Sequence, residues 1–499
     1  MAKISVLIAQ LNYNPEDLDY NYKKILNTYI EAQQSADLIL FSRYAMSGYI
    51  ENEPILSGNF LYNCTQYIQN LALQTKNQKA SIIIGSVINR NNFLHEIIYF
   101  IQNGNIKELT CTPIHYQNTN NNVILYVKQI RVLLSFNCKI DDDLNAQLLL
   151  IMDNTPYRQS LHKNYNDISS NKPIIYINLV GGYGNRVFYG GSFIYNKKFF
   201  FSLGLWKENK QLIYIPNLQS NGITHTISNN SSSHYQALML SLKDYTYKNH
   251  FTNVLLGMSG GIDSSLVASI ASDALGPNKV YGFMLPTQYT SNSSIYAAKE
   301  CSVNLAINYK TLYIENIFKS SLISLQDIFI NLQQDITEEN LQSRIRGLIL
   351  MAISNKFKFL LLSTGNKSEL LTGYTTLYGD MCGGFAPIKD LYKTQIYKLV
   401  HWRNNNIPEN SLCQKINIIP NIIINKPPSA ELNYNQKDQD TLPEYSVLDS
   451  ILELLVNKNY SKEEVINQGY KEQVVNYIIS LVQKSSFKHK LSAVGPLIS

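Results

Sequence analysis

The chain has 499 residues, of which 45% are apolar and 16% are charged, and its formal net charge is +6. This length exceeds what one hydrophobic core supports, and the composition is that of a folded globular protein rather than a disordered one. The small net charge comes without a long basic run, which argues against nucleic acid as a partner.

The first residues, MAKISVLIAQLNYN, lack the basic start, long apolar core and small-residue cleavage site of a secretory signal. No apolar run approaches the length that spans a bilayer, so we expect no membrane partner. The six cysteines show no CxxC pair and no zinc-type histidine spacing, which predicts reduced thiols. We therefore expect a cytoplasmic protein.

Short apolar runs with turn residues between them dominate the first half of the chain. The clearest are ISVLIAQL, DLILF, SIIIGSVI, RVLLSF, QLLLIM and PIIYINLV. Helix-like stretches at 21–34 and 60–75 separate some of these runs. Apolar strands alternating with amphipathic helices predict an α/β unit with a largely buried sheet, which we expect to cover residues 1–222.

A polar segment, ITHTISNNSSSH (223–234), has no apolar core of its own and is the expected linker. From residue 235 a helical pattern leads into NVLLGMSGGIDSSLVASIA (253–271), where a second α/β unit begins. The pattern from about 445 onward is helical. The second domain is expected to cover residues 235–499.

The stretch MSGGIDSS (258–265) lies between a predicted strand and a predicted helix. Adjacent glycines let the backbone approach an anion, and the helix start offers free N–H groups. Asp263 would repel a phosphate unless Mg²⁺ bridges the two. The alternative is a glycine-rich turn with a capping Asp or Ser. The chain has no GxxxxGK[ST], so it is not a Walker-type NTPase.

SGGIDSS resembles the pyrophosphate-binding loop of the ATP pyrophosphatases. Four downstream motifs, ENLQSRIRG, LLSTGNKSELLTGYTTLYGDMCGG, PIKDLYKTQIYKL and KPPSAELNYNQKDQDTLPEY, together resemble the NAD⁺ synthetases within that superfamily. The resemblance implies a Rossmann-like, doubly wound parallel sheet. It also implies that deamido-NAD⁺ is adenylated by ATP and that ammonia then displaces AMP. One departure is Gln288, where the family usually has an arginine.

The resemblance also implies a set of site residues and a homo-oligomer. Asp263 and Glu369 are the expected Mg²⁺ ligands, and with Lys393 they are the expected catalytic residues. ATP and pyrophosphate are expected to contact Ser259, Gly260, Gly261, Asp263, Ser264, Ser265, Thr364 and Lys393. Deamido-NAD⁺ is expected to contact Asn340, Arg344, Arg346, Glu369, Asp380 and Lys488.

The first half resembles a nitrilase-type glutamine amidase domain, which larger NAD⁺ synthetases carry as their source of ammonia. The resemblance lies in AQLNYNPEDLDYNYKKI, ADLILF with SGY, IIIGS, TPYRQSLHK and VGGYGNRVFYGGSF. It implies an α-β-β-α sandwich. The chemistry of that family needs a glutamate base, a lysine for the oxyanion and a cysteine nucleophile.

All three residue types are missing at the matching positions. Arg43 stands at the base position, and a guanidinium has no accessible neutral form with which to accept a proton. No lysine occurs between Lys107 and Lys128, and Ser135 stands at the nucleophile position. Cys138 is three residues further along, a spacing that in a strand points to the opposite face. We therefore expect a degenerate amidase.

Three hypotheses follow. The first is an ATP- and Mg²⁺-dependent NAD⁺ synthetase that uses free ammonia. The second is the same enzyme with glutamine as nitrogen source, through unusual residues or a separate glutaminase. The third is a non-catalytic scaffold, against which the ordered motifs after residue 235 argue.

Overall fold

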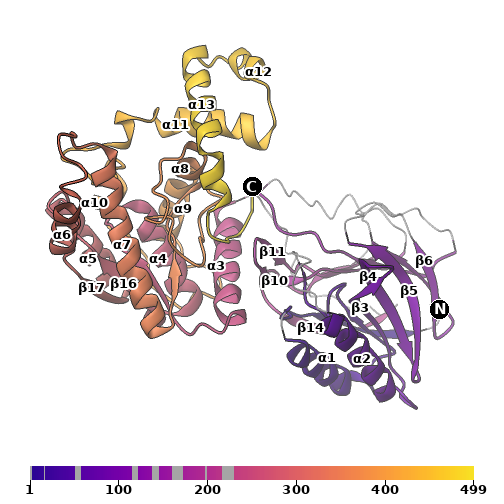
Figure 1. Cartoon of the computed structure of the whole chain (residues 1–499). Coiled ribbons are helices and arrows are strands. Elements are labelled where there is room, and N and C mark those ends of the chain that lie inside the picture. Colours follow the sequence, from indigo (N-terminus) through magenta and orange to yellow (C-terminus); the bar gives the residue numbers. More distant parts are fainter. Residues whose placement is uncertain are drawn as a thin grey trace. The chain divides into compact units, whose positions relative to one another are not determined.

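The computed structural model divides the chain into two compact units, Met1–Asn229 and Asn230–Ser499 (Figure 1). It describes residues 3–15, 17–50, 58–114, 122–136, 145–159, 172–196, 199–215 and 230–499. No helix in these ranges is both long and apolar enough to cross a membrane.

The first unit contains two six-stranded sheets. One has the order β14-β1-β2-β3-β4-β5, in which β1, β2 and β3 run parallel. Its strands are β1 (Ile4–Gln10), β2 (Leu38–Phe41), β3 (Ser81–Arg90), β4 (Phe93–Gln102), β5 (Asn105–Pro113) and β14 (Asn209–Ile215). The remaining pairs are antiparallel. The central strands β1, β2 and β3 are mostly apolar and almost entirely buried because both faces of this sheet are covered.

The second sheet has the order β13-β12-β9-β8-β7-β6, with β7, β8 and β9 parallel. Its strands are β6 (Val123–Val127), β7 (Ile130–Ser135), β8 (Leu148–Met152), β9 (Ile174–Ile177), β12 (Phe193–Asn196) and β13 (Phe199–Ser202). A short hairpin, β10 (Val180–Tyr183) and β11 (Arg186–Tyr189), follows β9.

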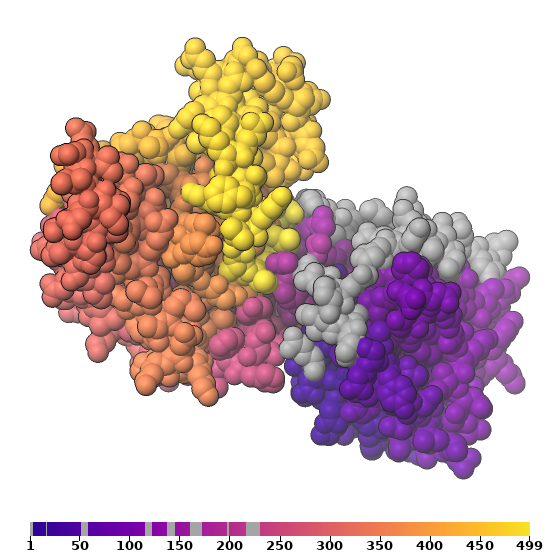
Figure 2. Space-filling model, in the orientation of Figure 1, coloured from indigo at the N-terminus to yellow at the C-terminus, as the bar shows by residue number. Residues whose placement is uncertain are grey.

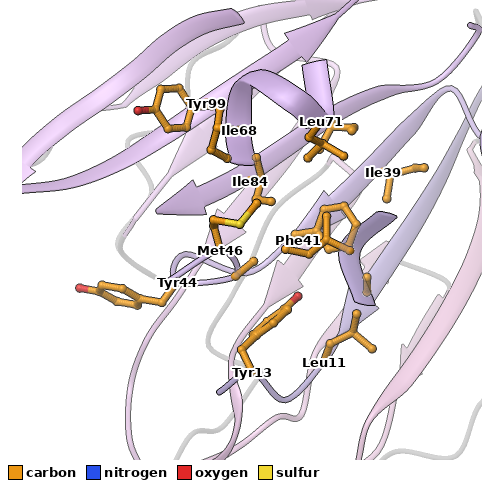
Figure 3. Close-up of a cluster of buried hydrophobic side chains, with 14 of the residues drawn as sticks. Leu11, Tyr13, Ile39, Phe41, Tyr44, Met46, Ile68, Leu71, Ile84 and Tyr99 are labelled. Carbon is orange, nitrogen blue, oxygen red and sulfur yellow. The ribbon is translucent and has the colours of Figure 1, made fainter. Parts of the chain in front are cut away.

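The two sheets pack face to face, and helices cover the outer face of the first. Alternate residues of β1 divide between two cores: Val6 and Ile8 meet the second sheet, whereas Leu7 and Ala9 meet the helices. The helices are α1 (Leu18–Ala32) and α2 (Gly58–Gln74). Figure 3 shows part of this helix-side core, including Met46. The expected sandwich is therefore confirmed, and the described residues form one helical layer and two sheet layers of it.

The second unit is built around a four-stranded parallel sheet with the order β17-β16-β15-β18. The strands are β15 (Val254–Gly257), β16 (Val280–Met284), β17 (Asn308–Thr311) and β18 (Leu360–Leu362). The chain builds outward from β15 to β17 and then returns to place β18 on the other side of β15. This reversal creates the crevice in which open α/β sheets bind ligands, directly after β15. The expected doubly wound parallel sheet is confirmed.

Helices surround this sheet. They are α3 (Ser231–Lys248), α4 (Ile262–Leu275), α5 (Asn292–Leu305), α6 (Glu315–Leu325), α7 (Ile336–Phe357), α8 (Lys367–Thr372), α9 (Lys393–Asn405) and α10 (Asn421–Asn425). The first of these helices, α3, begins inside the expected linker (223–234) and so corrects where that linker ends. Asn230 accepts a hydrogen bond from the N–H of Ser233 and so starts α3 at Ser231, four residues before residue 235. Residues 223–229 lie outside the described ranges.

The C-terminal residues form a helical layer that packs on α8 and on the residue before α9. It contains α11 (Tyr445–Leu452), a π-helical turn (Glu453–Asn457), α12 (Lys462–Asn467) and α13 (Glu472–Lys490). Leu371 and Tyr392 join its apolar core. Beyond α13 the chain returns to the sheet layer, where the N–H of Ala386 donates to the carbonyl of Val494 at 2.8 Å. In Figure 2 this yellow segment lies against orange residues of the same unit.

Candidate active site

The loop after β15 has the geometry of an anion-binding turn. Gly260 has a φ of +76°, and a Cβ there would lie 2.4 Å from the carbonyl oxygen of Ser294, so only glycine fits. Gly261 precedes the 14-residue helix α4 and supplies no side-chain cap. The N–H groups and the positive end of the helix therefore face the loop. The hydroxyl of Ser259 accepts from the N–H of Gly261 at 3.2 Å and holds the turn.

This loop opens into a cavity of about 370 Å³. Twelve of the residues expected to bind ATP, Mg²⁺ or deamido-NAD⁺ line it. They are Ser259, Gly260, Gly261, Asp263, Ser264, Asn340, Arg346, Thr364, Glu369, Asp380, Lys393 and Lys488. These positions are spread over 230 residues of sequence, and the parallel sheet brings them to one place because its strands end at the same edge.

Two expected residues are not among those that the structure places along the cavity. Ser265 is fully buried, and its hydroxyl donates to the carbonyl of Gly261 at 2.9 Å, so it supports the turn from behind. Arg344 lies on the exposed side of α7, and its Nε donates to the carbonyl of Leu377 at 3.2 Å. Arg346, two residues on, lies on the cavity side of the same helix because the helical period separates the two.

Lys393 is the centre of the charged group at the cavity. Its Nζ lies 2.6 Å from Oδ2 of Asp263 and 3.2 Å from Oε1 of Glu369, and its side chain is 3% exposed. Burial alone would lower the pKa of Lys393, but the two carboxylates outweigh burial and raise it, so the lysine is a cation. Asn366 completes the group, since its Nδ2 donates to Oδ1 of Asp263 at 3.0 Å.

Glu369 is held in an orientation that faces both the lysine and the cavity. Its N–H donates to Oδ1 of Asn366 at 3.0 Å, and its own Oε2 accepts from the N–H of Asn366 at 3.3 Å. This capping box begins α8. Burial raises the pKa of Glu369 to about 8, Lys393 opposes that shift, and Asp263 adds to it.

The donor set at this group fits Mg²⁺. Asp263 and Glu369 each offer two carboxylate oxygens, and each oxygen accepts a single hydrogen bond from Lys393 or Asn366, which leaves further lone pairs. Mg²⁺ prefers oxygen ligands and is held by one or two carboxylates together with substrate phosphates and water. Among the described residues no group of three or more His, Cys, Asp or Glu side chains is placed to hold a metal by itself.

The other end of the cavity is built from α7, the segment 373–380 and the end of α13. Asn340 accepts from the hydroxyl of Thr376 at 2.7 Å, and Asp380 accepts from the N–H of Thr376 at 2.6 Å. Lys488 donates to the carbonyl of Thr375 at 2.7 Å. Burial raises the pKa of Asp380 and lowers that of Lys488. Polar groups of both signs thus line this end of the cavity.

Sequence reasoning missed Lys426 and Asp438, two of the four charged residues of the cavity lining that it did not single out; the other two are Glu339 and Glu431. Lys426 pairs with Glu431 at 2.6 Å and also contacts the hydroxyl of Ser294, beside the glycine turn. Asp438 is 3% exposed and accepts from the hydroxyl of Tyr445 at 2.8 Å, while its Oδ1 has no hydrogen-bond partner among the described residues. Lys426 and Asp438 both lie in KPPSAELNYNQKDQDTLPEY. This motif as a whole carries the family resemblance, but it does not indicate which of its single residues face the cavity.

Gln288, which stands where the family usually has an arginine, is not part of the described lining of the cavity. Its side chain is exposed, and its N–H donates to Glu315 at 3.1 Å. The residues that line the cavity in the described structure do not include it.

In the first unit, an ion pair occupies the position of the expected glutamate base. Arg43 follows β2, and its Nη2 lies 2.6 Å from Oε2 of Glu96 while its Nε contacts Oε1 of the same carboxylate. Its Nη1 donates to Oδ1 of Asn154 at 3.2 Å, and the hydroxyl of Tyr44 donates to Glu96 at 2.8 Å. The side chains of Arg43 and Glu96 are 15% and 5% exposed.

This ion pair was not predictable from Arg43 alone. Glu96 comes from β4, 53 residues along the chain. The pairing of β3 with β4 places it against the end of β2. Ser135 is buried at the end of β7, and Phe136 after it lies 5.3 Å from the guanidinium carbon of Arg43. Cys138 lies outside the described residues.

Comparisons with known proteins agree with both units. The NAD synthase family model matches residues 234–492. The glutamine-dependent NAD(+) synthetase of Xylella fastidiosa (strain Temecula1) is 33% identical, over 99% of this chain and 96% of that protein. That of Synechocystis sp. is 35% identical, over 98% and 95%.

Two solved structures match over the whole chain. The glutamine-dependent NAD⁺ synthetase from Acinetobacter baumannii in complex with ADP has a TM-score of 0.74 at 28% identity, covering 100% of this chain and 96% of that one. The enzyme from Cytophaga hutchinsonii has a TM-score of 0.78 at 18% identity, covering 100% and 95%, and supports the fold. The chain belongs to the NAD synthase family of enzymes, with a nitrilase-like unit in front of its synthetase unit.

Proposed function

We propose that the chain amidates deamido-NAD⁺ to NAD⁺ in an ATP- and Mg²⁺-dependent reaction. The observation that carries the proposal is Lys393, held between Asp263 and Glu369 at the end of a glycine turn and facing a cavity. The nicotinate carboxylate attacks the α-phosphorus of ATP, pyrophosphate leaves, and ammonia then displaces AMP from the adenylate. No protein nucleophile is required, so catalysis consists of positioning and charge stabilisation.

The residues divide between the two halves of that reaction. The N–H groups at the start of α4 and the hydroxyls of Ser259 and Ser264 receive the leaving pyrophosphate. Lys393 neutralises the charge that develops on the bridging oxygen as a point cation. Asp263 and Glu369 hold Mg²⁺, which when bound screens the phosphates from each other and from the attacking carboxylate. Thr364 contacts ATP.

The dinucleotide occupies the other end of the cavity. Asn340 and Asp380 accept hydrogen bonds from its ribose hydroxyls and nicotinate side, and Arg346 and Lys488 supply positive charge toward its phosphates. Arg346 is fit for this role since its Nε is fixed by the carbonyl of Leu285 at 3.0 Å. Arg344 stays a weaker candidate, because it lies outside the described lining of the cavity.

The nitrogen source has two candidates, each with its own support. The named relatives above are glutamine-dependent, and they match this chain over nearly its whole length, which favours glutamine. The residues of this chain favour free ammonia, because Arg43 and Ser135 replace a base and a thiol. We propose ammonia as the substrate of the synthetase unit and keep glutamine as the second candidate.

One assay separates these candidates. The purified chain is given deamido-NAD⁺, ATP and Mg²⁺ with either ammonium or glutamine, and NAD⁺ is measured. Turnover with ammonium and none with glutamine supports the proposal. Turnover with glutamine in an ammonia-free preparation overturns the ammonia proposal and leaves the synthetase activity standing. Absence of turnover with either source, in a folded protein, supports the scaffold hypothesis.

We also propose that the chain assembles with a second copy. Six large apolar side chains of α6, α7 and the segment between them are 63–72% exposed, and they are Ile323, Ile328, Ile330, Leu332, Ile336 and Leu348. Exposed apolar surface of this extent marks a protein–protein contact. Light scattering of the purified chain, compared with the Leu332→Lys and Leu348→Lys variants, checks whether these residues hold an oligomer together.

We place the protein in the cytoplasm. The cysteines that the structure describes, Cys64, Cys111, Cys301, Cys382 and Cys413, are all free thiols. Free thiols are the usual state in a reducing compartment.

A further inference from the structure

A side chain from a third helix joins the two helices that carry Glu369 and Lys393. Asp449 lies on α11 and is 4% exposed. Its Oδ1 accepts from the hydroxyl of Ser368 at 2.6 Å, and its Oδ2 accepts from the N–H of Thr394 at 2.8 Å. Ser368 directly precedes Glu369 in α8, and Thr394 directly follows Lys393 in α9. The carboxylate thus bonds to the neighbours of both charged residues.

These bonds also cap α9. The first N–H groups of a helix have no partner inside it, and a carboxylate close to them is stabilising. The N–H of Lys393 donates to the hydroxyl of Ser368 at 3.0 Å, and that of Thr394 to Asp449. Tyr392, the residue before the helix, supplies no side-chain cap. The start of α9 is therefore held by α8 and α11 in addition to the hydrogen bond that the N–H of Tyr392 donates to Gln395 at 2.9 Å.

The consequence concerns the side chain of Lys393. Its Nζ must lie within 2.6 Å of Asp263 and 3.2 Å of Glu369 at once, which fixes α9 relative to both α4 and α8. The Asp449 carboxylate and the Ser368 hydroxyl set the position of α9 relative to α8. Asp449 is not among the residues that the structure places along the cavity, so it acts through Lys393 and not on substrate.

We propose that Asp449 is a positioning residue for the adenylation step, holding Lys393 where it neutralises the leaving pyrophosphate. The kinetic effect expected of Asp449 rests on the proposed function. Its positioning role rests on the hydrogen bonds described above. Packing alone does not account for the carboxylate. Leu448, Ile451 and Leu452 already bury α11 against the apolar core of the C-terminal layer. The Asp449 carboxylate is the part of α11 that bonds to the residues next to Glu369 and Lys393.

Asp449→Asn tests this, because asparagine keeps the shape and the packing but can accept only with one atom. The measurement is the first turnover of pyrophosphate release without a nitrogen source, with deamido-NAD⁺, ATP and Mg²⁺ all in saturating excess over enzyme, so that the amplitude counts folded sites. We expect the rate constant to fall about 10- to 100-fold, as a misplaced catalytic group does, with the amplitude unchanged. A merely structural role would lower the amplitude, through loss of folded enzyme, and leave the rate constant near that of the wild type.

Two further variants make the result decisive. Asp244→Asn is the matched control, since Asp244 is also a buried carboxylate but lies on α3, where it pairs with Lys248 at 3.5 Å. Its rate constant should stay within about twofold of the wild type. Lys393→Ala combined with Asp449→Asn should be no slower than Lys393→Ala alone, because Asp449 acts through the lysine. Fully additive losses would overturn the proposal.

A crystal structure of the Asp449→Asn variant answers the question without activity. We expect the Nζ of Lys393 to leave hydrogen-bond distance of Asp263 or Glu369. An unmoved lysine overturns the positioning role whatever the kinetics show. If the wild type releases no pyrophosphate with deamido-NAD⁺, the proposed function fails, and the crystal structure still decides the role of Asp449 in the geometry.

Discussion

Each unit of the molecule holds a buried cation against a carboxylate, and the two arrangements differ in what they leave free. In the first unit the planar guanidinium of Arg43 meets both oxygens of Glu96, and Asn154 and Tyr44 bind the remaining edges. In the second unit Lys393 is shared between Asp263 and Glu369, and all three side chains line a cavity.

The difference teaches that a buried charge does not by itself identify an active site. A bidentate arginine pair satisfies its own donors and acceptors, so it leaves little to offer a substrate. A lysine is a compact cation whose three donors can turn toward a new acceptor, and carboxylates that share it keep lone pairs for a metal ion. The first arrangement is suited to structure and the second to phosphate chemistry.

Among the substitutions that test this difference between the two units, Asp263→Asn is expected to have the largest effect. The change removes a metal ligand and one of the two partners of Lys393 while keeping the side-chain size. We expect NAD⁺ formation to fall about 10³-fold, the scale of losing one electrostatic contact to the transition state. Asp440→Asn is the matched control, because Asp440 is exposed and its Oδ2 caps a short turn by accepting from the N–H of Lys437. A loss of less than tenfold at Asp263 would mean that the chemistry lies elsewhere.

Arg43→Ala is expected to have the next largest effect, and on stability rather than on catalysis. Removing the guanidinium leaves Glu96 buried without its cation, which costs about 3 kcal/mol of unfolding free energy in the first unit. Urea unfolding followed by a probe in that unit measures it, and the ammonium-supported rate per folded molecule should not change. Combining Arg43→Met with Glu96→Gln should restore most of the stability. Loss of the ammonium-supported rate in either variant would show that the first unit takes part in synthesis.

Most of the predicted synthetase-site residues line one cavity, because they occur in ordered motifs along a parallel sheet. SGGIDSS, STGNKSE and DLYKTQ each follow a strand or begin a helix, so their positions at one edge follow from the fold. Ser265 and Arg344 do not line the cavity, because the helical period turns their side chains away from it. Motif membership does not distinguish those faces.

Contacts between side chains that lie far apart in the sequence were not predictable. Arg43 was predicted not to act as a base, but its partner on β4 depends on strand register and has no local signal. Lys426 and Asp438 lie in a segment of loops and short helical turns, where no periodic pattern assigns a direction to a side chain. The contacts of Asp449 with α8 and α9 also join residues that are far apart in the sequence, so no local pattern predicts them.

Binding of Mg²⁺ to the second unit should depend on pH. Burial raises the pKa of Glu369 to about 8, so below that pH the folded protein holds a proton where the metal must bind. The Mg²⁺ concentration for half-maximal pyrophosphate release should therefore increase as pH falls from 8 to 6, by up to about tenfold per pH unit. Following pyrophosphate avoids the titration of ammonia itself.

The matched control for this experiment is Glu369→Gln, which has no proton to lose at this position. Its residual pyrophosphate release should show a weaker dependence on Mg²⁺ and a flat profile between pH 6 and 8. A flat profile in the wild type would instead show that Lys393 keeps Glu369 ionised throughout.

The smallest effect is expected from Ser135→Ala, which tests the first unit at its former nucleophile position. Ser135 is buried at the end of β7, and a serine without a general base is a poor nucleophile. Glu96 is the carboxylate that the structure places beside Arg43, and its hydrogen bonds to the guanidinium and to Tyr44 hold it in the ion pair. The change should leave NAD⁺ formation with ammonium within about twofold of the wild type.

The same variant with glutamine as nitrogen source decides between the two candidates for this unit. If the wild type forms NAD⁺ from glutamine and Ser135→Ala abolishes that rate, the serine is a working nucleophile and the amidase is not degenerate. If Cys138→Ala abolishes it instead, the thiol three residues along has taken over the reaction. When neither change affects a glutamine-supported rate, the ammonia reaches the synthetase unit from another protein. The first two results each assign the chemistry to a residue of this chain, whereas a glutamine-supported rate that neither change affects, or no such rate at all, leaves the first unit as structure.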